Sequence, residues 1–291
     1  MPRYNTDALV STEWLADHLR SPDVRIVDAT YYLPHEGKNG REEFERAHIP
    51  GAVFFDIDDI ADTGSELPHM VPSAEKFSSK VRKLGLGDGS RIVVYDQKGI
   101  ASSPRAWWMF RLFGHQDVTV LDGGLPKWLA ENRPTEEGPV QVRDERHFTA
   151  RFNHTMLRDV DQMRRNLSSG RDQVLDARSP SRFEGSEELW PGRRLGHIPG
   201  SLNLPFNALI DPDTQTLKAP EELERLFDEA GVQPRKPVVT TCGSGLTAAI
   251  LALGLHVTGH RDVAVYDGSW AEWGLPGDTP VETGSPGRSS D

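Results

Sequence analysis

Short apolar runs alternate along the chain with longer segments that have a helical period. Runs of the first kind are typical of strands buried on both faces, and they stand at 24–30, 92–96, 118–121, 173–179, 238–242 and 263–266. Segments of the second kind predict helices at 11–19, 104–114, 155–167 and 246–255. This alternation predicts an α/β fold, in which parallel sheets carry helices on both faces.

The same order of motifs occurs twice. His48 of the first HIPG motif follows Asp28 by 20 residues, and His197 of the second follows Asp176 by 21. Further along, IVVYD corresponds to VVTTC, and VTVLDGGLPKW corresponds to VAVYDGSWAEW, with six residues from Asp to Trp in both. Two structural copies of one unit are therefore expected.

These copies predict the domain organisation. A length of 291 residues exceeds what one core usually fills. The polar segment 131–148 contains Pro and Gly and is typical of a linker. We expect a first domain over 1–132, a linker over 133–153, a second domain over 154–280 and a tail over 281–291. The polar end of the chain, from residue 277 on, is expected to be frayed.

The charge balance and the cysteine count disfavour several classes of partner and cofactor. Lys and Arg total 33 against 44 Asp and Glu, and a net charge of −11 disfavours nucleic acid and anionic membranes as partners. The single cysteine excludes an internal disulfide, and no Cys/His cluster has zinc spacing, so no metal or other cofactor is expected. The first ten residues do not resemble a signal peptide, and the longest apolar run is about half a membrane span. These features predict a soluble cytoplasmic protein.

The single cysteine occupies an unusual position. Cys242 directly follows a predicted strand, and ligands of parallel sheets bind beyond the carboxyl ends of strands. Gly243, Ser244 and Gly245 allow a tight curl before a helix that begins near Thr247. Backbone N–H groups of such a curl, together with the helix dipole, stabilise a thiolate nucleophile.

Two other interpretations of Cys242 exist. A lone intracellular cysteine is most often an inert, buried small hydrophobe. The first copy has Asp96 at the equivalent place without a glycine pair, which indicates that only the second copy is built for chemistry. A phosphatase would need an arginine six residues after the cysteine to clamp the phosphoryl group, and that residue is Ala248.

Taken together, the tandem repeat, both HIPG motifs, ASSPRAWWMFRLFGH, VLDGG and CGSGLTA resemble the two-domain rhodanese superfamily of sulfurtransferases, from about residue 8 to 277. This resemblance implies a catalytically silent first domain. It also implies that Cys242 of the second domain accepts a sulfur atom as a persulfide.

Within that family, the residues directly after the cysteine differ between members that use different sulfur donors. Members that use thiosulfate carry two basic residues there, where this chain has Gly243 and Ser244. The loop is similar to that of members that use 3-mercaptopyruvate, which leaves as pyruvate. The resemblance thus implies sulfur transfer from 3-mercaptopyruvate to a thiol such as thioredoxin or glutathione, or to cyanide. A thiosulfate:cyanide sulfurtransferase and a non-catalytic sulfur carrier or binding module are the alternatives.

The resemblance also implies residues that bind the donor. Arg182 falls on the arginine that binds substrate in the family, and the Cys242 loop contributes Gly243, Gly245 and Thr247. A second family arginine follows nine residues later, where this chain has Pro191. Arg193 and Arg194 stand shortly after, and we expect Arg193 to substitute.

A relay of Ser244, His69 and Asp58 is the last feature that the resemblance implies. Such a relay moves a proton between the substrate thiol and the pyruvate enolate. Alternatively, Ser244 satisfies hydrogen bonds of the loop and His69 caps a backbone group.

Other conspicuous residues are expected to be structural. His48 and His197 occur in both copies, so we expect each to fix a turn. Asp96 and Arg105 are expected to shape the domain interface, without a catalytic part. A structural role in the core or the interface is also expected for five tryptophans, Trp107, Trp108, Trp128, Trp270 and Trp273.

Overall fold

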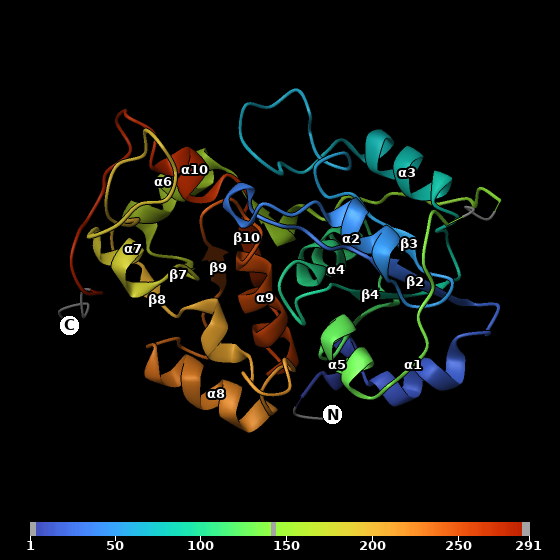
Figure 1. Ribbon diagram of the computed structural model, residues 1–291. Helices are drawn as coiled ribbons and strands as arrows, with labels where there is room; N and C mark the ends of the chain where they lie inside the picture. Colours follow the sequence, from blue (N-terminus) through green and yellow to red (C-terminus); the bar gives the residue numbers. More distant parts are fainter. Residues whose placement is uncertain (1–3, 141–143, 287–291) are drawn as a thin grey trace.

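The computed structural model describes residues 4–140 and 144–286. It contains two parallel five-stranded sheets of identical topology (Figure 1). The first sheet has the order β1 (Leu9–Val10), β5 (Val118–Leu121), β4 (Arg91–Tyr95), β2 (Val24–Asp28) and β3 (Val53–Phe54). The second has the order β6 (Leu157–Arg158), β10 (Val263–Tyr266), β9 (Val238–Thr241), β7 (Gln173–Asp176) and β8 (Leu202–Asn203). Two copies of one α/β unit are confirmed.

Helices cover both faces of each sheet. Alternate residues of β4 show this, because Val94 belongs to one core cluster and Val93 to another. In the first unit the helices are α1 (Thr12–His18), α2 (Gly40–Arg46), α3 (Ala74–Lys83), α4 (Ser103–Leu112) and α5 (Gly124–Ala130). In the second they are α6 (Val160–Ser169), α7 (Pro180–Glu184), α8 (Pro220–Glu229), α9 (Ala248–Val257) and α10 (Ser269–Trp273).

Four short 3₁₀ helices complete the described elements: η1 (Thr6–Ala8), η2 (Pro34–Glu36), η3 (His154–Met156) and η4 (Phe206–Leu209). The helix predicted at 155–167 is wrong at its start, because η3 and β6 precede α6. Asp159 sets the later start: its side chain accepts from the Gln162 N–H, and Gln162 reciprocates at the Asp159 N–H.

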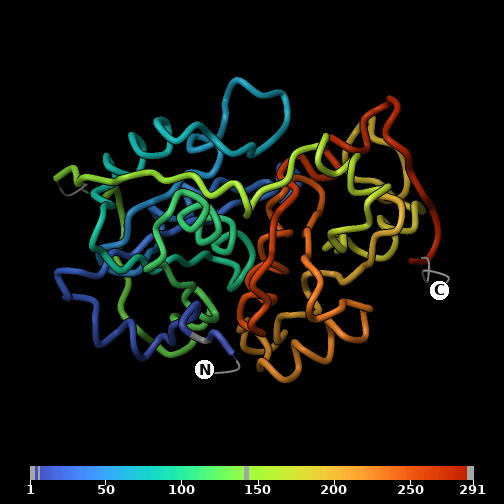
Figure 2. The backbone as a smooth tube through the Cα atoms, turned by 180° about the vertical axis from the view of Figure 1, so that it is seen from behind, coloured from blue at the N-terminus to red at the C-terminus, as the bar shows by residue number. Residues whose placement is uncertain are grey.

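The two units meet along α4 and α9, which lie side by side between the sheets (Figures 1 and 2). Nine of ten residues are buried in each of these helices, so their apolar side chains leave no solvated face. Trp107 and Trp108 of α4 and Ile250 and Leu253 of α9 belong to one core cluster that spans both units. This shared core fixes one domain against the other.

The segment after each unit returns to its HIPG turn. Glu136 pairs with His48, and Glu282 pairs with His197, through antiparallel bridges. Gly284 adds a hydrogen bond from its N–H to the carbonyl of Glu184. The expectation of a frayed end is therefore wrong up to Gly284, because the backbone there is hydrogen-bonded; residues 287–291 lie outside the described range.

Within 4–140 and 144–286, no helix has the length and apolar character needed to cross a membrane.

Candidate active site

Cys242 lies at the carboxyl end of β9, buried to 2% exposure. Its N–H donates to the Ser269 Oγ at 3.2 Å, and its carbonyl accepts from the Trp270 N–H at 3.0 Å. The carbonyl of Gly243 accepts from the Ala271 N–H at 2.7 Å. The start of α10 thus fixes the backbone on which the thiol is carried.

Unused backbone donors follow the thiol. Among the described residues, no protein acceptor takes the N–H groups of residues 243–248, which run from the loop into α9. Gly245 enables the curl, because its φ of +79° is in the left-handed region. Thr247 is the N-cap residue of α9, and its side chain makes no capping bond. The loop therefore offers its amides to an anion beside Cys242.

The equivalent loop of the first unit shows such a cradle with its anion in place. The Asp96 carboxylate accepts backbone N–H groups from Lys98, Ala101, Ser102 and Ser103 at 2.8–2.9 Å. The Ser103 hydroxyl adds a bond of 2.7 Å. In the first copy a fixed side chain satisfies the donors, whereas in the second they remain available.

Arg182 and Trp190 lie directly over the loop. A Cβ placed on Gly243 would stand 2.9 Å from the Trp190 Nε1 and 3.4 Å from the Arg182 Nη2. A side chain at position 243 would therefore require Trp190 to shift. The structure brings Arg182 of α7 to the loop as the sequence predicts, whereas Trp190 was missed because no periodic pattern marks the irregular segment 185–200.

Glu188 fixes the direction of Arg182. Its carboxylate accepts from the Arg182 Nη2 at 2.7 Å and contacts Arg178 at 3.4 Å. Arg178 is buried and forms a forked pair with Asp176. The Nε of Arg182 has no partner. Arg182 is thus held in place with hydrogen-bonding capacity left for a ligand.

Arg193 and Arg194, the two candidates for a second substrate arginine, have different contacts. Arg194 donates to the carbonyls of Trp273 and Thr279 and to the Thr279 hydroxyl, so it holds the C-terminal segment. Arg193 donates from Nε to the carbonyl of Ala271, whose own N–H binds Gly243. Arg193 is therefore connected to the loop through Ala271. The guanidinium of Arg194 is bound to the C-terminal segment instead.

His69 comes to the site from the other domain. Its Nδ1 lies 2.7 Å from the Asp58 Oδ1, and its side chain is buried while that of Asp58 is 62% exposed. His69 has a φ of +58°, which is strained for a residue with a Cβ. Its Nε2 is buried without a partner. The Asp58–His69 pair is thus formed, with one ring nitrogen unused.

The third member of the expected relay is not hydrogen-bonded to that nitrogen. Ser244 is buried, but its Oγ makes no bond with the His69 Nε2. The ring of Tyr31 meets His69 edge-on at 4.6 Å between centroids. Burial, Asp58 and Glu36 raise the pKa of Tyr31, so its phenol stays neutral beside the pair. Tyr31 is a site neighbour that the sequence did not indicate.

Arg105 of α4 reaches across the domain boundary into the loop. It is fully buried and donates to the Gly245 carbonyl at 3.3 Å and the His69 carbonyl at 2.5 Å. Its Nη2 also lies 2.7 Å from the Asp267 Oδ1. Arg105 thus joins the segments that carry His69 and Cys242.

The two HIPG histidines have structural contacts only. His48 stacks on Phe44 and its Nδ1 lies 2.8 Å from the Phe44 carbonyl. His197 does the same with Phe183, at 2.7 Å. Both contacts fit the expected role in fixing a turn.

Known proteins resemble the chain over most of its length. The family described as rhodanese-like domain matches residues 11–131 and 159–275. Human 3-mercaptopyruvate sulfurtransferase is 45% identical, covering 91% of each chain. An Arabidopsis thaliana protein named thiosulfate/3-mercaptopyruvate sulfurtransferase 1, mitochondrial, is 41% identical over 96% of this chain and 79% of its own.

Solved structures agree with this relation. The crystal structure of SseA from Escherichia coli, a 3-mercaptopyruvate sulfotransferase by its description, superposes with a TM-score of 0.83. It is 39% identical and covers 91% of this chain and 99% of its own. Its match extends across both units, as the family match does. With two rhodanese-like domains in tandem, the chain belongs to the rhodanese family.

Proposed function

We propose that the protein is a sulfurtransferase that takes sulfur from 3-mercaptopyruvate and passes it to a thiol, such as thioredoxin or glutathione, or to cyanide. The observation that carries the proposal is the loop of free backbone donors behind Cys242, at the place where Asp96 fills the equivalent loop. A persulfide is an anion that such donors stabilise. The family and the names of the relatives support the same reaction.

In the first half-reaction, the Cys242 thiolate attacks the sulfur of 3-mercaptopyruvate. The carbon–sulfur bond breaks, its electron pair forms the enolate of pyruvate, and the sulfur remains on Cys242 as a persulfide. Arg182, with Arg193 nearby, holds the donor carboxylate and ketone. The proton of the substrate thiol moves to the enolate carbon, and the Asp58–His69 pair with Ser244 is placed to carry it.

In the second half-reaction, an acceptor thiolate attacks the outer sulfur and restores the Cys242 thiolate. The cycle needs no external oxidant, because the two electrons that the transferred sulfur gives up remain on the carbon that becomes the methyl group of pyruvate. The uncharged pair Gly243 and Ser244 favours 3-mercaptopyruvate over thiosulfate. A dianionic donor would gain most from basic side chains at these positions.

Parallel steady-state kinetics with the two donors test this proposal. We expect kcat/KM to be higher with 3-mercaptopyruvate than with thiosulfate. A large preference for thiosulfate would contradict the donor assignment. Normal turnover by Cys242→Ser with either donor would contradict the persulfide mechanism and leave a role that does not use the thiol.

A further inference from the structure

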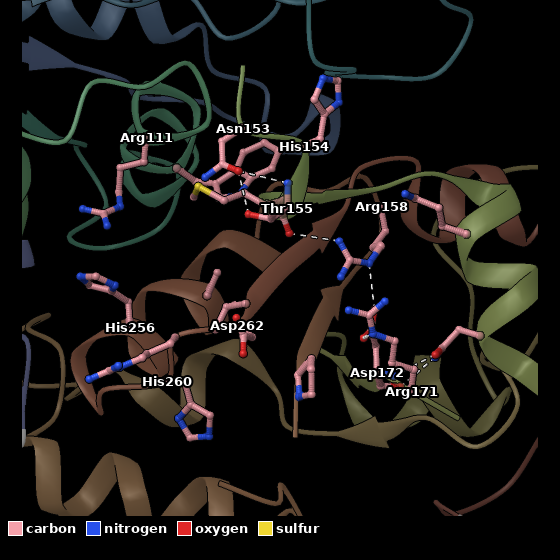
Figure 3. Close-up of a pocket in the computed structure, with 18 of the residues that line it drawn as sticks. Arg111, Asn153, His154, Thr155, Arg158, Arg171, Asp172, His256, His260 and Asp262 are labelled. Atoms are coloured by element: carbon pink, nitrogen blue, oxygen red, sulfur yellow. Dashed lines mark hydrogen bonds and ion pairs between the residues drawn. The ribbon is translucent and has the colours of Figure 1, made fainter. Parts of the chain in front are cut away.

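A separate cavity of about 690 Å³ opens between the two domains, at the opposite end of the second sheet from Cys242. Pro237 precedes β9, and Asp262 and Val263 stand at the start of β10, whereas Cys242 follows the carboxyl end of β9. Parts of α4, α6, α9 and the segment 153–158 form the other walls (Figure 3). This cavity is distinct from the proposed sulfur-transfer site.

The lining is strongly basic in a chain whose net charge is −11. Its charged and titratable side chains are five arginines, three histidines and two aspartates. One aspartate, Asp172, is already paired with Arg158 at 2.8 Å and with Arg171 at 3.9 Å. The arginines and histidines outnumber the aspartates, and one of the two carboxylates is already paired, so the cavity is suited to an anionic ligand.

Arg111 and His256 are the central pair of this lining. Within 4–140 and 144–286, no carboxylate comes within 4 Å of either side chain, and Asp7 acts on both only from farther away. Burial and the charge of Arg111 lower the pKa of His256 to about 4. Two groups that repel each other when charged thus face one space, and among the described residues neither has a carboxylate in direct contact.

Neighbouring polar atoms also lack partners. The Arg111 guanidinium lies over the Trp107 ring, 5.2 Å from its centre, and the Trp107 ring lies 5.4 Å from that of His256. The Trp107 indole N–H and the His260 Nε2 are buried without a hydrogen bond. Figure 3 shows Arg111, His256 and His260 along one side of the cavity, with Arg158 and Asp172 on the other.

We propose that this cavity binds a compact oxyanion of the phosphate or sulfate class, free or as the end group of a larger metabolite, held by Arg111, His256 and His260. A guanidinium stacked on an indole presents its fork in a fixed direction, and that fork matches two oxygens of such an anion. Trp108, Met156 and Ala252 in the lining offer apolar contact to the body of a larger ligand.

Binding has a consequence for the helix pair. Arg111 lies in the last turn of α4 and His256 in the last turn of α9, so one anion joins both helices. The first turn of α4 contains Arg105, which contacts Gly245, and α9 begins directly after the Cys242 loop. The ligand should therefore stabilise the domain interface and raise the unfolding temperature.

Calorimetric titration of the full-length chain with phosphate, sulfate and phenyl phosphate, at constant ionic strength set by sodium chloride, tests this site. We expect saturable binding of one anion per chain. Arg111→Gln should weaken it about tenfold or more, since one charge-assisted contact is lost. Arg225→Gln, an equal charge change on the exposed face of α8, should leave the affinity within about twofold.

A second cavity variant tests the site independently, in case Arg111→Gln impairs folding. His260→Gln removes a ring from the cavity but leaves the stack of Arg111 on Trp107 intact, and it should also weaken binding. Tighter binding of phenyl phosphate than of phosphate supports an end group of a larger ligand, and equal binding supports the free anion. Absence of saturable binding by all three probes, or equal affinities in the wild type and both variants, overturns the proposal.

Discussion

At the residue scale, Arg105 joins the two domains at the point where the reaction is proposed. It contacts the backbone of His69 and of Gly245, and it forms a fully buried ion pair with Asp267. Removing one member of such a pair leaves an uncompensated buried charge, which costs about 3–5 kcal/mol. Arg105 therefore acts as a positioning residue for the Cys242 loop.

Arg105→Met should lower the free energy of unfolding by about 3–5 kcal/mol, because Asp267 then stays buried without a counter-charge. The double variant Arg105→Met with Asp267→Asn should recover part of this loss, as urea unfolding would show. Its kcat should stay low, because the contacts to His69 and Gly245 are still absent. A loss below about 1 kcal/mol in the single variant would contradict the buried-pair interpretation.

His69→Asn should lower turnover of 3-mercaptopyruvate more than turnover of thiosulfate, because only the first donor leaves as an enolate that needs a proton. Asparagine tolerates the left-handed backbone of position 69, so the loop should keep its shape. Steady-state assays with both donors measure the difference, and Ser244→Ala should behave alike. Equal losses with the two donors would mean that these residues only shape the loop.

The sequence indicates some of these residues and not others, for a physical reason. Cys242 and Arg182 stand in short motifs with fixed spacing, and in the fold Arg182 lies over Gly243, the residue after Cys242. Trp190 and Glu188 lie in an irregular segment, so only tertiary packing places them over Gly243. The cross-domain reach of Arg105 depends on how α4 docks, which no local pattern specifies.

At the scale of elements, the two loops that follow β4 and β9 differ in how their donors are satisfied. The central strands and α4 and α9 were predictable, because apolar runs and helical periods mark them. The two-residue edge strands β1, β3, β6 and β8 were not, since two residues have no period. At the strand end, the Asp96 carboxylate accepts the donors of its loop, whereas the donors after Cys242 have no protein acceptor among the described residues.

Gly245→Ala should disrupt the Cys242 loop. Its Cβ would lie 2.7 Å from the Asp267 carbonyl oxygen, in addition to the cost of about 1–2 kcal/mol for a φ of +79°. Sulfur transfer should fall by about 100-fold, as expected when reacting groups move by about 1 Å. Gly89→Ala has a similar φ of +77° with nothing near its Cβ, so it should lose stability but keep activity.

Asp28 at the end of β2 gives the stability a pH dependence. Burial raises its pKa from 3.8 to about 6, so the folded state holds this proton more tightly than the unfolded state. The Asp28 contribution to stability is then present below about pH 4 and lost as pH rises to about 6, by up to about 3 kcal/mol. The free energy of unfolding in urea should therefore fall more between about pH 4 and pH 6 in the wild type than in Asp28→Asn. The same pH dependence in both proteins would contradict this effect of Asp28.

At the scale of the whole molecule, the two copies exchange equivalent contacts across a pseudo-symmetric interface. Asp267 of the second domain accepts the Val71 N–H of the first, and Asp122 of the first accepts the Leu217 N–H of the second. This symmetry extends the repeat that the sequence predicted. Only the second domain has a cysteine at this position, followed by backbone N–H groups without a protein acceptor among the described residues. The molecule therefore has one proposed reaction centre.

The most direct test is the intact mass of the protein after incubation with 3-mercaptopyruvate in the absence of an acceptor. The persulfide mechanism predicts a gain of one sulfur atom on Cys242, with release of one pyruvate per chain and reversal by a thiol. Cys242→Ser should show neither change. A wild-type protein that gains no sulfur and releases no pyruvate would contradict sulfur transfer through Cys242.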